Sequence, residues 1–513
     1  MVRLEYGTLL PLIPAQETTK LTDTRDVQAD AKPDNSKWIA LALLAMTQFI
    51  VILDASIVNV ALPSIGSDLQ FSQDNLSWVV NAYVLTFGGF LLLGGRMADL
   101  LGRRRIFVSG LILFGLASLA GGLAQSDGWL IVARAAQGIG AALVSPAALS
   151  IVTTTFTEGS ERNKALGVWG AVAGAGGAAG VLLGGVLTEY LGWEWVLLVN
   201  TPIALVAAFL APRLLAESRD ERASTFDVPG AVSVTAGLAL LVYSLVNAEQ
   251  AGWGSTETVV LLGGAIALLA LFVVIEMRTA HPLMPFSIFK LRTLRGANMV
   301  ALLIAMSLFS MFFFISLYLQ QVLGYSALEA GLAYLPLSVL IIVSAGVGSQ
   351  LVTRIGFKPT LIAGTLFTAA GLLWFSQVSP GGSFVSDVLF PSMLAAVGLG
   401  LSFVTFTIAG VAGTSNDDAG LASGILNTSQ QVGGALGLAI TATVANATTK
   451  DLFASGERNP AVALTEGFQD AFLVCAGFAV LGAVFAAVSV STRDSREHAQ
   501  AAQSGQVEAV PAV

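Results

Sequence analysis

The chain has little charge. Only 11 % of its 513 residues are Asp, Glu, Lys or Arg, whereas about 25 % is usual in soluble proteins. Apolar residues make up 55 %, and the mean hydropathy is +0.77. A core of this composition cannot be covered by so few polar side chains. The scarcity of charge therefore excludes a soluble globular protein and indicates a membrane protein.

Cysteine and histidine are almost absent, which removes several kinds of functional site. The single cysteine, Cys475, excludes an internal disulfide and a cysteine-based metal site. The two histidines, His281 and His498, argue against a zinc site. We therefore expect neither a metal nor a cofactor.

The motifs of several other protein classes are also missing. No basic stripe indicates a nucleic-acid partner. No G-x-x-x-x-G-K-[ST] loop is present, so an ATP-driven pump is excluded and the energy must come from an ion gradient. No nucleophile with a base occurs at membrane depth, which argues against a membrane enzyme. The loops are too short to hold the soluble domain of a sensor.

Long apolar runs recur along nearly the whole chain. They are long enough to cross a hydrocarbon layer of about 30 Å as helices, and alternation with period two is absent, which argues against an outer-membrane barrel. We expect an all-α integral membrane protein with fourteen spans. The predicted spans are 38–60, 77–97, 106–125, 129–152, 164–187, 194–211, 228–247, 258–276, 296–320, 328–351, 358–376, 385–409, 420–446 and 469–490.

The basic residues of the loops predict the orientation. Cytoplasmic loops are rich in Lys and Arg. Connections 1, 3, 5, 7, 9 and 11 contain none, and 21 of the 25 basic residues lie on the side of the even-numbered connections or in the tails, with Lys164 and Lys358 at the first positions of their spans. Both termini are therefore predicted to be cytoplasmic. The twelfth connection is the exception, because it carries Asp417 and Asp418 without a basic residue.

A turn after the second span is repeated after the tenth. The copies are GGRMADLLGRRRIFVSG (94–110) and GSQLVTRIGFKPTLIAG (348–364), and Thr353 and Ser349 replace the acid and the leading glycine in the second. Duplicated halves are common in transporters. The expected organisation is an N-terminal tail (1–37), a six-helix bundle (38–212), a linker with two extra transmembrane helices (213–294), a second six-helix bundle (295–491) and a C-terminal tail (492–513), with both tails irregular.

Several motifs resemble those of one transporter family. GRMADLLGRRR resembles its loop signature, LIVARAAQGIGAA (130–142) its fourth-span signature and LDASIVNVALP (53–63) its first-span signature. WEWVLLVNTPI (193–203) and GLASGILNTSQQVGGALG (420–437) resemble its sixth- and thirteenth-span patterns. Together they resemble the fourteen-span drug:proton antiporters of the major facilitator superfamily. The resemblance implies two six-helix bundles plus two central helices.

The fifth span carries the resemblance to exporters. Its glycines follow the antiporter spacing, except that Val181 stands where the family has proline. These glycines are Gly167, Gly176, Gly180, Gly184 and Gly185. The resemblance implies a proton-coupled efflux transporter of hydrophobic or amphipathic drugs, a monomer in a bacterial plasma membrane. An importer of a small nutrient or ion is the alternative.

Asp54 and Arg134 are the candidate proton-coupling residues. Helical rise places both at similar depth in the outer half of the membrane, within the same bundle. Intramembrane acids usually line a working cavity, and an apolar setting favours the protonated form. We hypothesise that Arg134 pairs intermittently with Asp54. A static ion pair that holds two spans together is the alternative.

The turn after the second span is the candidate cytoplasmic gate. A carboxylate can accept the free N–H groups of a helix start and is stabilised by the helix dipole there. We therefore expect Asp99 at the start of the thirteenth span, and the arginines of the turn against Asp417 and Asp418. An orientation signal for the arginines and an N-cap for Asp418 are the simpler alternatives. The predicted gate residues are Gly95, Asp99, Gly102, Arg103, Arg104, Arg105, Asp417 and Asp418.

Polar residues within the spans are candidates for a substrate cavity, although ordinary helix packing also explains them. They are Asn81, Tyr83, Gln137, Gln320, Asn427 and Gln431. The expected partners are a small-molecule substrate, protons and the lipid bilayer.

Overall fold

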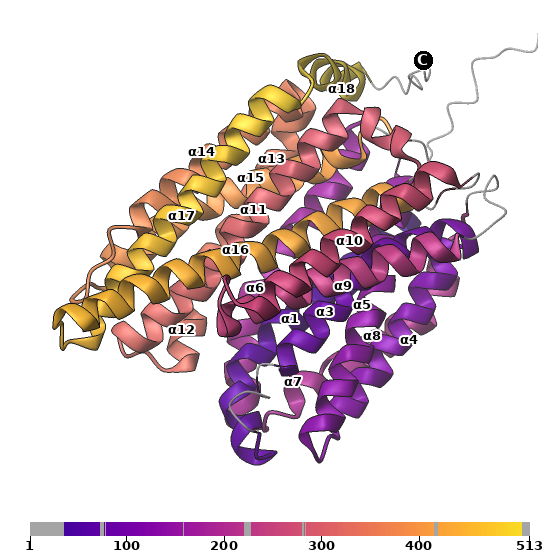
Figure 1. Ribbon diagram of the computed structural model, residues 1–513. Helices are drawn as coiled ribbons and strands as arrows, with labels where there is room; N and C mark the ends of the chain where they lie inside the picture. The colour runs from indigo at the N-terminus through magenta and orange to yellow at the C-terminus, as the bar shows by residue number, and fades with distance from the viewer. Residues whose placement is uncertain are drawn as a thin grey trace, which may run out of the picture.

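Helices form all of the regular secondary structure that the computed structural model describes. It describes residues 35–71, 76, 78–156, 159–219, 227–279, 282, 284–414 and 419–504. Figure 1 shows two groups of long helices, with the N-terminal group in indigo to magenta and the C-terminal group in orange to yellow. Helix α18 lies at one end of the molecule, and α7 and α12 lie at the other.

Each predicted bundle is present. The N-terminal bundle consists of α1 (Asn35–Asp68), α3 (Trp78–Leu101), α4 (Arg103–Gly122), α5 (Asp127–Thr155), α6 (Ser160–Tyr190), α7 (Trp195–Leu198) and α8 (Asn200–Leu214). The C-terminal bundle consists of α11 (Arg292–Leu317), η2 (Tyr318–Val322), α12 (Ala327–Ala333), α13 (Leu335–Ile355), α14 (Phe357–Phe375), η3 (Phe384–Leu389), α15 (Phe390–Val411), α16 (Ala419–Ser455) and α17 (Pro460–Ser489). Between them lie α9 (Val228–Ala251), α10 (Thr256–Arg278) and η1 (Phe286–Lys290).

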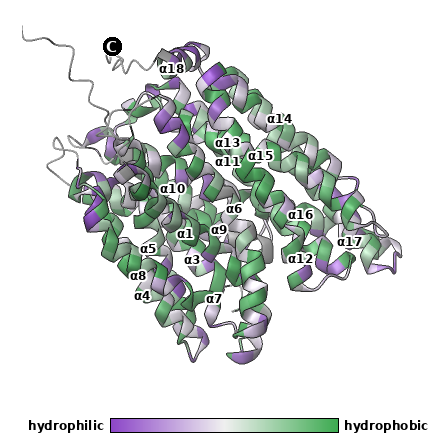
Figure 2. Ribbon diagram, turned by 180° about the vertical axis from the view of Figure 1, so that it is seen from behind, coloured by the Kyte–Doolittle hydropathy of each residue, from purple (hydrophilic) through white to green (hydrophobic). Residues whose placement is uncertain are grey.

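All fourteen predicted spans contain a helix. In the described part of the chain, twelve helices are long and apolar enough to cross a membrane, and α6 makes thirteen if its two segments, bent by 41°, form one span. The one predicted span that is not among these thirteen is α14, whose first turn carries Lys358 and Pro359. Figure 2 shows apolar residues along the helices and polar ones gathered at their ends. The bend in α6 is present although Val181 replaces the family proline.

Glycine makes the same turn in both halves. Gly102 between α3 and α4 has φ of 109°, and Gly356 between α13 and α14 has φ of 88°. Residues other than glycine rarely adopt a positive φ of this size, because the Cβ clashes with the backbone. Both copies of the repeated turn therefore place a glycine with positive φ at the same position of the repeat.

Glycine also sets the distance between helices. A Cβ on Gly140 would lie 2.6 Å from Phe114 N and 2.9 Å from Phe114 Cα, both of them backbone atoms of α4. We expect Gly140→Ala to force α4 and α5 apart and to lower stability by about 1–3 kcal/mol, the usual cost of overpacking. The thermal unfolding midpoint in detergent measures this. Gly263→Ala is the matched control, because nothing lies within 4 Å of the added atom in α10; an equal loss there would contradict the packing argument.

The central pair is packed against both bundles. Gly89 of α3 lets α9 approach, since a Cβ there would lie 3.0 Å from Ala239 Cβ. Trp253 Nε1 donates a hydrogen bond of 2.7 Å to Thr443 Oγ1 of α16. Helix α9 therefore covers the line of contact, or seam, between α3 and α16. The sequence suggests only a spacer between the bundles, whereas this helix packs against both of them.

The C-terminal tail is not irregular throughout, so that expectation is wrong for residues 492–504. They form α18 (Thr492–Ser504), which lies at one end of the molecule. Ser495 Oγ accepts a hydrogen bond of 3.0 Å from Lys358 N at the start of α14. His498 Nε2 lies 3.1 Å from Asn163 Oδ1 of α6. Buried Ser495, Ala499 and Ala502 hold the helix on this surface.

Candidate functional site

The two predicted proton-coupling residues form a buried ion pair. Arg134 Nη1 lies 2.6 Å from Asp54 Oδ2, and both residues are 0 % exposed. Asp54 comes from the middle of α1 and Arg134 from the outer part of α5. The similar depth that helical rise predicts for them is confirmed by this contact.

Two amide side chains complete the shell around the carboxylate. Gln137 Nε2 and Asn200 Nδ2 each donate a hydrogen bond of 2.8 Å to Asp54 Oδ1. Gln137 also donates to Ser118 Oγ at 3.0 Å and accepts from Arg134 Nη1 at 2.7 Å. The charged carboxylate of α1 therefore receives three donors, from α5 and α8, and α4 contacts the site through Ser118 and Gln137.

Helix α3 supplies two further contacts of Arg134. Arg134 Nε donates to Val79 O at 3.0 Å, and the guanidinium carbon lies 4.4 Å from the ring centroid of Tyr83. The hydroxyl of Tyr83 donates to Val51 O at 3.0 Å. A cation over an aromatic face is attracted electrostatically. Arg134 thus has partners that do not depend on the charge of Asp54.

The glycines of α6 that follow the antiporter spacing pack against the part of α1 that carries Asp54. A Cβ on Gly176 would lie 3.0 Å from Ile52 Cγ2, one on Gly180 would lie 2.8 Å from Leu53 O, and one on Gly184 would lie 2.7 Å from Ile57 O. Gly185 is also buried. Gly167 lies nearer the start of α6, where its Cβ would be 2.9 Å from Ser349 Cβ of the other bundle. The glycine spacing therefore lets α6 press against the turn of α1 that carries the acid.

This arrangement can hold or release one proton. A fully buried carboxylate is stable as an anion only when it is paired and hydrogen-bonded. Any displacement of α5 or α8 from α1 removes donors from Asp54 and favours its protonated form. The charge that Asp54 can hold therefore depends on how close α5 and α8 lie to α1.

The predicted contact between Asp99 and a helix start is also present. Leu421 N at the beginning of α16 donates a hydrogen bond of 2.9 Å to Asp99 Oδ2. The other oxygen, Oδ1, accepts from Arg103 Nε at 3.1 Å and from Arg103 Nη2 at 2.8 Å. Asp99 is 0 % and Arg103 2 % exposed. The hydrogen bond from Leu421 N to Asp99 joins the two bundles, with Gly95 of α3 facing α16 at Gly424. The Asp99–Arg103 ion pair itself lies within the N-terminal bundle.

The other arginines of the turn have a partner that sequence analysis missed. Arg104 Nε and Arg105 Nε lie 3.5 and 3.8 Å from Glu217 Oε2, and Arg104 N donates to Glu217 Oε1 at 3.1 Å. The predicted partners Asp417 and Asp418 lie outside the described residues. Glu217 follows α8 in the same bundle, so these two pairs do not join the halves.

The second copy of the turn makes a matching contact without charge. Ser349 Oγ donates to Asn163 O at 2.6 Å, and Asn163 Nδ2 donates to Thr353 Oγ1 at 3.0 Å. By the repeat, Thr353 occupies the position of Asp99, and Asn163 lies at the start of α6 as Leu421 lies at the start of α16. The two bundles are therefore linked at this end by two related hydrogen-bonded contacts, of which one involves the carboxylate of Asp99 and the other involves uncharged groups.

The predicted cavity residues do not form one group. Tyr83 and Gln137 belong to the enclosed site around Asp54, and both are 0 % exposed. Gln320 is exposed at the outer end of its helix and donates to Ser316 Oγ. Asn427 and Gln431 lie on α16 at the seam: Asn427 is hydrogen-bonded to Ser145 of α5, and Gln431 faces Gly88 of α3. Asn81 of α3 is half-buried.

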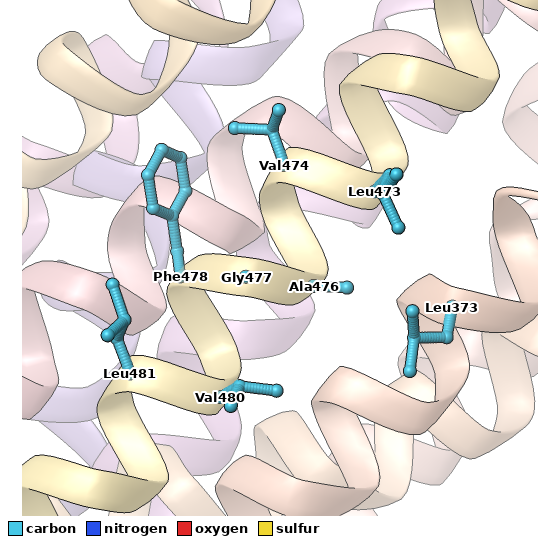
Figure 3. Close-up of a pocket in the computed structure, with 8 residues that line it drawn as sticks. All are labelled: Leu373, Leu473, Val474, Ala476, Gly477, Phe478, Val480 and Leu481. Carbon is cyan, nitrogen blue, oxygen red and sulfur yellow. The ribbon is translucent and has the colours of Figure 1, made fainter.

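An apolar groove between α14 and α17 is visible in Figure 3. Its lining consists of Leu373, Leu473, Val474, Ala476, Gly477, Phe478, Val480 and Leu481. Leu473 is 53 % and Leu373 46 % exposed, so the groove opens on the outer surface of the helix bundle. Such a surface suits lipid chains, and it offers no group that could orient a polar substrate.

Comparison with known proteins identifies the family. The family model described as Major Facilitator Superfamily matches residues 44–438. The chain belongs to the major facilitator superfamily. It is therefore a multi-pass membrane transporter and not an enzyme, with two six-helix bundles and two central helices.

Curated relatives in this superfamily cover nearly the full length. The chain is 43 % identical to the cephamycin export protein of Amycolatopsis lactamdurans over 88 % of this chain and 93 % of that protein. It is 39 % identical to the puromycin resistance protein of Streptomyces alboniger over 90 % of this chain and 93 % of that protein. Among solved structures, a human organic anion transporter has a TM-score of 0.64 at 17 % identity, over 88 % of this chain and 99 % of that one. This last likeness shows the major facilitator fold alone.

Proposed function

We propose that the protein is a proton-coupled antiporter that exports hydrophobic or amphipathic antibiotic-like compounds by alternating access. The observation that carries the proposal is the enclosed Asp54 carboxylate, which is paired with Arg134 and held by two amides. An intramembrane acid with this surrounding can exchange one proton per cycle. The relatives that are named for cephamycin export and puromycin resistance support the substrate class and the outward direction.

The orientation and location are part of the same proposal. The basic loops favour a bacterial plasma membrane with both termini in the cytoplasm. That orientation puts Asp99, Arg103 and α18 at the cytoplasmic end, where the two bundles are linked. The proposal also takes the protein to be a monomer, in which one pair of bundles forms the transport unit.

Expression in a host that lacks its own exporters tests the direction of transport. We expect lower susceptibility to puromycin and to a cephamycin, and we expect an uncoupler to remove the protection because the proton gradient supplies the energy. In everted vesicles that have been acidified inside, adding substrate should release protons. Higher susceptibility of the expressing host, with uptake driven by protons, would instead identify an importer.

A further inference from the structure

The two amides that hold Asp54 differ in how firmly they are fixed. Gln137 is bonded at both ends: its Oε1 accepts from Arg134 Nη1 at 2.7 Å, and its Nε2 donates to Asp54 and to Ser118. Turning this amide would place its N–H groups against a guanidinium, which has only donors. The Gln137 amide therefore keeps one orientation.

Asn200 is bonded at one end only. Its Nδ2 donates to Asp54 Oδ1 at 2.8 Å, and its own Oδ1 is buried without a hydrogen-bond partner in the part of the chain that the structure describes. The whole residue is 0 % exposed. An unpaired buried acceptor is costly, so a partner that arrives in another state of the site would stabilise it. Asn200 begins α8 directly after the break that follows α7, which places its side chain against α1.

Protonation of Asp54 supplies that partner. A carboxylate only accepts hydrogen bonds, whereas a carboxylic acid has one O–H that must donate. The donors around Asp54 suit the anion, and none of them can accept that proton while it keeps its orientation. A half-turn of the Asn200 amide exchanges its nitrogen for its oxygen at the same position.

We propose that Asn200 is a positioning residue that reverses its amide when Asp54 takes up a proton. In the charged state, Nδ2–H donates to the carboxylate. When a proton adds to Asp54 Oδ1, an O–H bond forms, the carboxylate loses its charge, and Arg134 keeps its own. The new O–H donates to Asn200 Oδ1, so both states of the acid have a matched partner. This inference rests on the proposed role of Asp54.

Infrared difference spectroscopy on the purified protein in lipid nanodiscs tests the proposal. The wild type should show a carboxylic-acid C=O band that appears at low pH and is absent in Asp54→Asn. In Asn200→Leu, whose side chain has the same branching and no polar atoms, we expect the band to move to higher wavenumber because the O–H has lost its acceptor. The pH midpoint of the band should rise by about one unit, since a hydrogen bond to the charged form is also lost.

The experiment distinguishes a failure of the proposed Asn200 reversal from a failure of the proposed proton site at Asp54. If Asn200→Leu shifts the midpoint but leaves the wavenumber unchanged, Asn200 serves the anion alone and the reversal is wrong. If the wild type has no band that depends on Asp54, the proton site itself is wrong and the inference falls with it. Thr201→Val is the matched control, because among the described residues the Thr201 hydroxyl is hydrogen-bonded to Gly115 O and not to Asp54, so its loss should move neither quantity. Asn200→Val makes the same comparison if Asn200→Leu does not fold.

Discussion

Asp54→Asn is expected to abolish proton-driven efflux while the protein still exchanges substrate across the membrane. The amide has the shape of the carboxylate and still accepts a hydrogen bond from Arg134, but it cannot take up a proton. It also leaves the guanidinium without its counter-charge, which costs about 3–5 kcal/mol for a buried pair. We therefore expect a lower yield of folded protein together with the loss of coupling. Reconstituted vesicles measure the two activities separately, as gradient-driven transport and as substrate counterflow.

A double variant distinguishes proton coupling from a static ion pair. If the pair only holds α1 and α5 together, Asp54→Leu combined with Arg134→Leu should restore transport, because apolar replacement of a buried pair is often neutral or stabilising. The proposed mechanism predicts a folded but uncoupled protein instead. Gradient-driven transport at the wild-type rate in Asp54→Asn would end the coupling hypothesis, and so would normal transport in Arg134→Ala.

Asp99→Ala is expected to open the cytoplasmic end. The change removes the acceptor of Leu421 N and leaves Arg103, which is 2 % exposed, without the carboxylate that it pairs with. A hydrogen bond to a charged group contributes about 1.5–3 kcal/mol, so the equilibrium between closed and open cytoplasmic ends should shift about tenfold or more. Transport should fall because the closed form is less populated.

Thiol labelling measures this shift. Ser145→Cys places a reporter at the seam between α5 and α16, where Ser145 contacts Asn427 and is 0 % exposed. The native Cys475 is buried and gives little background. A membrane-impermeant thiol reagent on the cytoplasmic side should label the reporter faster in the Asp99→Ala background. Arg105→Ala is the control, since its side chain is 74 % exposed and such pairs contribute about 0–1 kcal/mol. Equal labelling rates in both backgrounds would show that Asp99 does not close this end.

Much of the site could be predicted because the membrane restricts what a helix can do. Asp54 and Arg134 are charges in long apolar runs, and helical rise is regular enough to place them at the same depth. Asp99 could be placed at a helix start because free N–H groups occur only there. The partners that lie far along the chain could not be predicted. Glu217 follows a different span from the arginines that it holds, and no local pattern links the two.

The sequence by itself determined that this chain lies in a membrane, how many helices cross it, which loops are basic and that two halves repeat, because each of these depends on composition or on short spacing. Only the tertiary structure decided which neighbours complete each site. Asn200 joins Asp54, Asn163 joins Thr353, and α18 lies across both bundles. In each case the deciding factor is how close two helices pack and which way a side chain turns between them, and that distance depends on every residue at the contact.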